Sequence, residues 1–129
     1  MAQVTQLAIE MENKPGALAA LCSALAEHAV NITGFLLCPA GAKGPVRLVV
    51  SSVETARRVC QQLGLQCKEE KVLAVQCASR PGALGRITRK LSEAGINVEY
   101  GYATIEKNSN RALVVIGVTD IEKAANVVK

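Results

Sequence analysis

The chain has 129 residues, half of them hydrophobic, with 2% aromatic residues and a formal net charge of +4. This length can bury a sizeable core, which aliphatic side chains must build because aromatic ones are scarce. The mild positive charge is compatible with an anionic ligand or with simple solubility, and it selects neither. Because there is no apolar run of membrane-spanning length and no signal-peptide pattern at the start, we expect a cytoplasmic protein with no membrane partner.

The first half of the chain alternates strand and helix patterns. Residues 4–11 are an apolar stretch typical of a strand. Leu18, Leu21, Cys22 and Leu25 then follow helical spacing, and Pro15 suits the start of that helix. Residues 30–37 and 46–50 are expected strands joined by a Gly- and Pro-rich loop at 38–45. A second helix should begin near Ser52 and end at Gly64, before a fourth strand at residues 65–71. Its expected inward residues are Ala56, Val59, Cys60 and Leu63.

The second half shows the same order of elements. Residues 72–77 are an expected strand, residues 96–105 and 112–118 are two more, and residues 106–111 form the loop between them. The helix between the first two places Leu84, Ile87, Thr88 and Leu91 on one face. A last helix begins near Thr119, which has capping-box spacing with Glu122. Its expected inward residues are Ile121, Ala124 and Val128.

The two halves are an internal repeat. ENKPGAL at residues 12–18 returns as ASRPGAL at residues 78–84, and the stretches 15–32 and 81–98 are identical at seven of 18 positions. The sequence therefore predicts an α+β protein of two tandem ferredoxin-like domains, residues 1–71 and 72–129, in the order βαββαβ followed by βαββα. We expect one antiparallel sheet of seven or eight strands with helices on one face. The last strand of the second repeat is missing or supplied from elsewhere, so we expect a homodimer in which a partner chain covers the open edge.

Several functional classes lack the residues that they need. The single histidine, His28, is far from any evident nucleophile, and the sequence has no metal-ligand cluster, no phosphate-binding glycine loop and no paired carboxylates, so we expect neither an enzyme nor a bound cofactor or metal. Nucleic-acid binding on such a sheet would need aromatic residues on the central strands. The five cysteines form no CxxC pair, and we interpret them as reduced thiols that are mostly small core residues.

The Pro-Gly segments carry a family resemblance. EMENKPGALAALCSALAEHAVNI and CASRPGALGRITRKLSEAGINV are similar to the ACT domain signature, in which a strand ends in Asn-x-Pro-Gly, a helix begins at that Gly, and a Val/Ile-Asn-Ile stretch opens the next strand. Over nearly its whole length the chain resembles stand-alone proteins made of two ACT domains. That resemblance implies an allosteric regulatory module that binds an amino acid and controls a metabolic enzyme.

The chemistry of the loops fits such a ligand. The first turn of a helix leaves backbone N–H groups unpaired and carries a partial positive charge, so it can bind a carboxylate. Gly16 and Gly82 have no Cβ, which lets a ligand approach the backbone closely. An asparagine amide beside them can donate and accept hydrogen bonds, as a zwitterion requires.

The resemblance implies two sites, each shared between two ACT domains. One combines Asn13, Gly16, Ala17 and Leu18 with Asn97, and the other combines Ser79, Gly82, Ala83 and Leu84 with Asn31. Ser79 replaces the asparagine of the first loop, which makes the second site the weaker one. Met11 occupies the position of a histidine in the phosphoglycerate dehydrogenase type of ACT domain, which argues against serine as the ligand.

Less specific interpretations stay open. Pro-Gly is also a common turn, and the two asparagines after the helices could serve only as left-handed residues at the helix ends. His28 could be no more than a solvated residue near a helix C-terminus. The alternative function is then a ligand-free dimerisation or interaction module that controls a metabolic enzyme.

Overall fold

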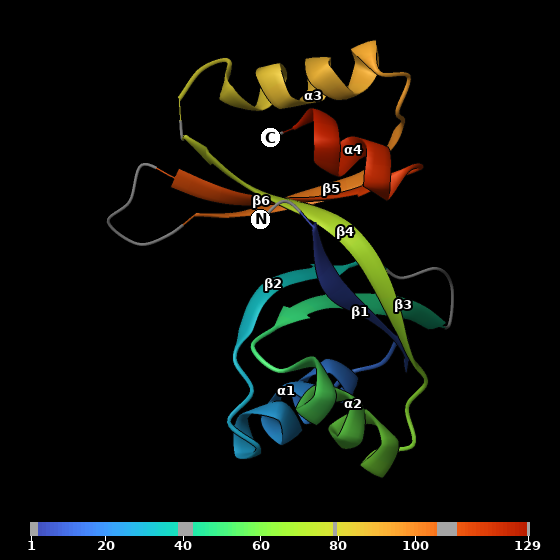
Figure 1. Ribbon diagram of the computed structural model, residues 1–129. Coiled ribbons are helices and arrows are strands. Elements are labelled where there is room, and N and C mark those ends of the chain that lie inside the picture. The colour runs from blue at the N-terminus through green and yellow to red at the C-terminus, as the bar shows by residue number, and fades with distance from the viewer. Residues whose placement is uncertain (1–2, 39–42, 79, 106–110, 129) are drawn as a thin grey trace. The chain divides into compact units, whose positions relative to one another are not determined.

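The computed structural model describes residues 3–38, 43–78, 80–105 and 111–128 (Figure 1). Within them it contains β1 (Gln3–Glu12), α1 (Ala17–Glu27), β2 (Ile32–Leu37), β3 (Lys43–Val50), α2 (Val53–Gln62), β4 (Cys67–Ala78), α3 (Ala83–Glu93), β5 (Val98–Ile105), β6 (Arg111–Val118) and α4 (Ile121–Val127). The described strands are hydrogen bonded in the order β2-β3-β1-β4-β6-β5. The predicted class is confirmed: this is an antiparallel α+β fold of two ferredoxin-like repeats.

The chain divides into two compact units. The first unit is Thr5–Glu70, and the second combines Met1–Val4 with Lys71–Lys129. The strand order in the first unit is β2-β3-β1-β4, so the last strand of the repeat, β4, lies next to its first strand, β1. In the second unit β4 takes the role of that first strand, and the order β4-β6-β5 repeats the arrangement. Each half therefore has the ferredoxin-like topology that the repeat predicts.

The core of the first unit lies between its sheet and its two helices. Alternate residues of β1, Leu7, Ile9 and Met11, face α1 and α2, and the antiparallel register pairs Ile9 with Val46 of β3. Leu21 and Leu25 of α1 are fully buried against them. The predicted helical stripe is thus correct at its centre, where each buried Leu contributes about 1.5–3 kcal/mol.

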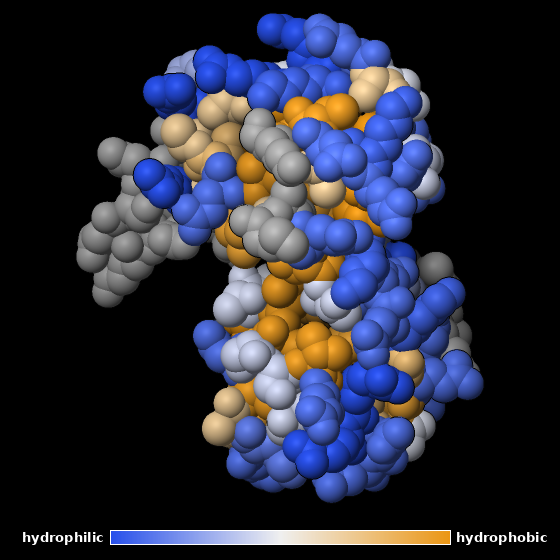
Figure 2. Space-filling model, in the orientation of Figure 1, coloured by the Kyte–Doolittle hydropathy of each residue, from blue (hydrophilic) through white to orange (hydrophobic). Residues whose placement is uncertain are grey.

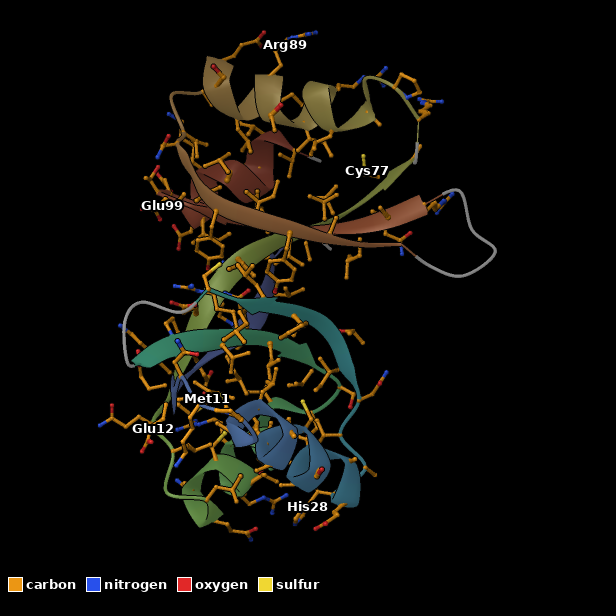
Figure 3. The ribbon with its side chains drawn as sticks, turned by 180° about the vertical axis from the view of Figure 1, so that it is seen from behind. Met11, Glu12, His28, Cys77, Arg89 and Glu99 are labelled. Carbon is orange, nitrogen blue, oxygen red and sulfur yellow. The ribbon has the colours of Figure 1, made fainter. Side chains whose placement is uncertain are left out.

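The second unit has its own core, in which α3 and α4 cover β4 and β6 (Figure 1). Leu91 of α3 is fully buried, but Leu84 at the start of the helix is 51% exposed, so its predicted inward position is wrong. Leu63, predicted to face the first core, is 44% exposed because α2 has already ended there. Figure 2 shows the hydrophilic outer surface over α3, and Arg89 points away from the sheet there (Figure 3).

Two helix starts are capped by side chains. Ser52 accepts a hydrogen bond from the Thr55 N–H at 3.3 Å at the start of α2, as the sequence predicts. At the start of α4 the cap is Asp120, which accepts from the Lys123 N–H at 3.1 Å, so the prediction of Thr119 is wrong. Thr119 instead accepts a hydrogen bond from the Asn97 N–H at 3.2 Å, because it lies directly after β6 and before the cap residue of α4.

The sheet differs from the expected one at β4 and β3. Predicted strands at 65–71 and 72–77 are one continuous strand, which passes from the first unit into the second, so the described strands number six and not seven or eight. β3 begins at Lys43, inside the predicted loop 38–45, because Pro45 pairs in register with Glu10. Residues 39–42 of that loop and 106–110 of the loop at 106–111 lie outside the described residues.

The position beside β4 that a fourth strand of the second repeat would take is occupied by the start of β1. Gln3 and Val4 belong to the second unit, and β1 is the neighbour of β4 in the sheet. The start of the chain therefore covers the edge for which we expected a partner chain. This corrects the physical reason for a homodimer, and dimerisation itself stays a prediction.

Candidate functional site

The first loop, residues 13–16, joins β1 to α1. Its backbone turns through hydrogen bonds from the Lys14 N–H to Glu12 O at 3.0 Å and from the Ala17 N–H to Lys14 O at 3.3 Å. Gly16 sits before the helix with φ 88°, a left-handed conformation that favours glycine. A Cβ at Gly16 would meet no atom within 4 Å, so the space in front of this residue is open.

The start of α1 differs from the starts of α2 and α4. The N-cap residue of α1 is Gly16, which has no side chain to cap the helix, and the first turn contains no acidic residue. By contrast α2 has Ser52 and Glu54, and α4 has Asp120 and Glu122. The first main-chain hydrogen bond of α1 runs from the Ala20 N–H to Gly16 O, so the N–H groups of Leu18 and Ala19 precede the helical ladder. The positive end of this helix is therefore left accessible to an anion.

A small pocket of ≈ 50 Å³ lies beside this helix start. It is lined by Met11, Glu12, Asn13, Lys14, Ala17, Leu18, Leu37 and Gly44. Figure 3 shows Met11 and Glu12 at the end of β1, next to the first turn of α1. A pocket of this size has room for a small polar group such as a carboxylate.

Charged groups of both signs stand at the rim of this pocket. The Lys14 ammonium lies 3.3 Å from a carboxylate oxygen of Glu12, and both side chains are 62% exposed. Such an exposed pair contributes little to stability because water screens it. Its groups can instead exchange partners with a zwitterion, whose carboxylate and ammonium match Lys14 and Glu12.

The second loop joins β4 to α3 and has the same backbone geometry as the first loop. Gly82 has φ 87° and ψ −12°, against 88° and −17° at Gly16. The Ala83 N–H donates to Arg80 O at 3.3 Å, and α3 likewise has no side-chain cap and no acidic residue in its first turn. The exposed Leu84 and half-buried Ala83 lie in that turn. Ser79 lies outside the described residues, so the predicted weakness of this loop stays a prediction.

Asn31 and Asn97 stand at equivalent positions before β2 and β5. The Asn31 N–H donates to Ser51 Oγ at 2.9 Å, and the Asn97 N–H donates to Thr119 Oγ1 at 3.2 Å. Both residues are exposed, and neither has a positive φ; the left-handed residues near the helix ends are Ala29 and Gly95. The expected left-handed conformation of these asparagines is therefore wrong, while a purely structural role between helix and strand stays open.

The structure brings together three of the predicted ligand-binding residues. Asn13, Ala17 and Leu18 line one pocket, with Gly16 adjacent in the loop. Asn31 follows the other end of α1, so within the first unit it does not join Asn13. His28 near that end has its Nδ1 2.9 Å from Ala24 O, which fits a structural role (Figure 3).

Sequence reasoning missed Glu12, Lys14, Leu37 and Gly44 as pocket residues. Glu12 and Lys14 flank Asn13 in the sequence, and their charge is the only sequence feature that could have identified them as pocket residues. Leu37 and Gly44 reach the pocket only because β2 and β3 pair beside β1, with Gly44 opposite Met11 in the register.

The thiols are only partly in the core. Cys60 and Cys77 are buried, Cys22 and Cys67 are intermediate, and Cys38 is exposed.

Among the described residues, no group of three or more His, Cys, Asp or Glu residues could hold a metal ion. None of the helices in the described part is long and apolar enough to cross a membrane.

Comparison with known proteins gives one family and several structures. A family model described as an ACT domain pair matches residues 2–129. The structure of protein BT0572 from Bacteroides thetaiotaomicron is similar with a TM-score of 0.90 at 28% identity, over 98% of this chain and 86% of that one. The ligand-free regulatory subunit of aspartate kinase from Thermus thermophilus is similar with a TM-score of 0.66 at 17% identity, over 98% and 90%. Its counterpart from Thermus flavus gives 0.62 at 15%, over 99% and 95%. No curated protein matches the sequence.

Proposed function

Because the chain belongs to the ACT domain family as an ACT domain pair, we propose that it is a non-catalytic regulatory protein that binds an amino acid at the first loop. The observation that carries this proposal is the contrast among the helix starts. The two helices that follow the Pro-Gly loops lack both a capping side chain and an acidic residue, whereas α2 and α4 have both. Leaving such donors uncapped makes physical sense where a ligand carboxylate is to bind them.

The proposed contacts follow from the pocket. The ligand carboxylate accepts hydrogen bonds from the N–H groups of Leu18 and Ala19, with Lys14 adding positive charge. The ligand ammonium donates to the Asn13 amide oxygen or to the Glu12 carboxylate, which lies on the same rim. In this proposal the pocket holds the charged end of the ligand, and a second surface covers its side chain. From the family resemblance, we assign that role to the strand opening of another ACT domain, at Asn97.

The second loop is the proposed weaker site. Gly82 and Ala83 offer the same backbone donors, and Asn31 is its expected partner. Ser79 has a shorter side chain than Asn13 and so offers a poorer reach to an ammonium. We therefore propose two sites of unequal affinity in each chain.

The regulated partner is proposed to be a metabolic enzyme. Proteins that share this fold include regulatory subunits of aspartate kinase, and the low identities to them support the fold alone. A homodimer and a cytoplasmic location belong to the same proposal. The mechanism would be a shift between conformations of the ACT pair, driven by the difference in amino-acid affinity between them.

A screen of the twenty amino acids by thermal shift, followed by calorimetric titration of the best one, tests this function. A ligand that binds only the folded chain raises the melting temperature. The matched variants are Gly16→Ala and Gly64→Ala, since both glycines have positive φ and open space for a Cβ. Both should lose about 1–2 kcal/mol of folding stability from left-handed strain, but only Gly16→Ala should weaken binding.

The alternative function predicts a different result. If the wild-type chain binds none of the twenty amino acids, the Pro-Gly loops are turns and the chain is an interaction module. Equal loss of binding in both glycine variants would place the ligand away from the first loop.

A further inference from the structure

The pocket at the start of α1 is lined partly by polar and partly by apolar side chains. The polar ones are Glu12, Asn13 and Lys14, which the proposed function uses for the charged end of the ligand. The apolar ones are Met11, Ala17, Leu18 and Leu37. Met11 is almost fully buried at the end of β1, whereas Leu37 at the end of β2 is 38% exposed. The apolar lining therefore extends from the core of the first unit out to solvent.

An exposed apolar strip, formed by Leu37 and Phe35, continues from this pocket along β2. Leu37 lies opposite Val46 of β3, and Phe35 lies opposite Leu48. Val46 and Leu48 are buried in the first core, and opposite residues of a sheet point to the same face. Leu37 and Phe35 thus stand on the helix-covered face, and their Cα atoms are about 7 Å apart, as two residues of a strand require. Phe35 is 49% exposed.

The composition of β2 suits contact with an apolar group. Its sequence, ITGFLL, contains no charged residue, although β2 ends the strand order of the described sheet and edge strands commonly carry charges. Exposed apolar surface beside a pocket is typical of a binding surface. An apolar ligand side chain placed there leaves water at a gain in free energy, whereas a polar one loses hydration without a new partner on Leu37 or Phe35.

The second repeat provides an internal comparison. In β5 the residues equivalent to Phe35 and Leu37 are Gly101 and Ala103, which lie opposite Ile116 and Val114 of the second core. The fold therefore forms without large side chains at this edge, so folding alone does not require Phe35 and Leu37. It also means that the second loop has no equivalent apolar strip.

We propose that the ligand of the first loop is an amino acid with a large apolar side chain, of leucine to phenylalanine size, whose side chain lies against Leu37 and Phe35. This inference rests on the proposed function, because it places the side chain of the same ligand. The charged end stays at the start of α1, and the second surface closes over the side chain. The second loop, with Gly101 and Ala103, offers such a ligand less apolar contact.

Calorimetric titration of the wild-type chain with L-leucine, L-phenylalanine, L-alanine, L-serine and L-lysine tests the ligand class. We expect leucine or phenylalanine to bind about tenfold or more tightly than alanine, and serine and lysine to bind no better than alanine. Tightest binding of serine, lysine or alanine would overturn this inference and leave the proposed function in place. Absence of binding by every one of the twenty amino acids would overturn both.

The variant Leu37→Ala tests the position of the side chain. It should weaken binding of the preferred large ligand about fivefold to tenfold and that of alanine less than about twofold, because a methyl group makes little contact with the strip. Leu63→Ala is the matched control, since Leu63 is 44% exposed in the same unit but follows the end of α2. It should change neither affinity. Equal weakening of both ligands by Leu37→Ala would overturn the inference.

A second copy of the chain is the other occupant that an apolar edge strand could have. Sedimentation of Leu37→Ala and Phe35→Ala distinguishes it from the ligand. If the strip served only contact between copies, both variants would shift the oligomeric state and leave the preference for leucine over alanine unchanged, which would overturn the inference. We expect Phe35→Ala to reduce that preference about fivefold, with an unchanged circular dichroism spectrum because Phe35 lies outside the buried core.

Discussion

At the scale of single residues, Asn13 is the side chain on which the proposed binding depends. It lines the pocket at the start of α1 and is exposed, outside the apolar core of the first unit. A hydrogen bond from a charged ligand ammonium to an amide oxygen is worth about 1.5–3 kcal/mol. Removal of the Asn13 side chain should therefore lower the affinity for the ligand strongly and leave the fold nearly unchanged.

We expect Asn13→Ala to weaken amino-acid binding about tenfold or more, measured by calorimetry, with an unchanged circular dichroism spectrum. Ser79→Ala should have a smaller effect if the second loop is the weaker site, and Asn97→Ala should resemble Asn13→Ala if the two side chains contact one ligand. Wild-type affinity in Asn13→Ala would remove this residue from the site.

At the scale of elements, the four helix starts are of two kinds. Those of α2 and α4 are closed by Ser52 and Asp120, and these caps stabilise the fold directly. Those of α1 and α3 begin at left-handed glycines with no side-chain cap. The chain thus forgoes some helix stability at the two places where a ligand carboxylate could act as the cap.

Asp120→Ala should lower the free energy of unfolding by about 1 kcal/mol, because the Lys123 N–H loses its partner and the helix dipole loses a negative charge. Urea denaturation measures this change. Asp120→Asn is the control, since it keeps the capping oxygen and should recover most of the loss. Equal destabilisation by both variants would mean that charge, and not the hydrogen bond, supplies the stability.

At the scale of the whole molecule, two long strands belong to both units. β4 leaves the first unit at Glu70 and enters the second at Lys71, while β1 contributes its first residues to the second unit and the rest to the first. The second repeat thereby obtains a neighbour for β4 from the start of the same chain.

Deletion of residues 1–4 tests this arrangement. We expect faster amide hydrogen exchange at residues 71–78, where β4 loses hydrogen-bond partners, and little change at Val46 and Leu48 in the first unit. Replacing Gln3 and Val4 by alanine keeps the backbone and should preserve the protection. Unchanged exchange after the deletion would show that β4 does not depend on the start of β1.

The amino-acid sequence alone determined the repeat, the fold class, the helix starts at the Pro-Gly loops and the centres of the apolar stripes at Leu21, Leu25 and Leu91. These features follow from local chemistry: proline and glycine restrict or free the backbone where they stand, and helical periodicity involves neighbouring turns only. The sequence also predicted that Asn13, Ala17 and Leu18 lie close together, because one loop carries all three.

The tertiary structure alone decided the features that depend on residues far apart in the chain. It joined two predicted strands into β4, placed Gln3 and Val4 beside that strand, and brought Leu37 and Gly44 to the pocket through strand register. In the tertiary structure Leu84 is exposed, and Asp120 is the residue that caps α4. Burial, register and strand continuity are set by long-range pairing, which local sequence patterns do not encode.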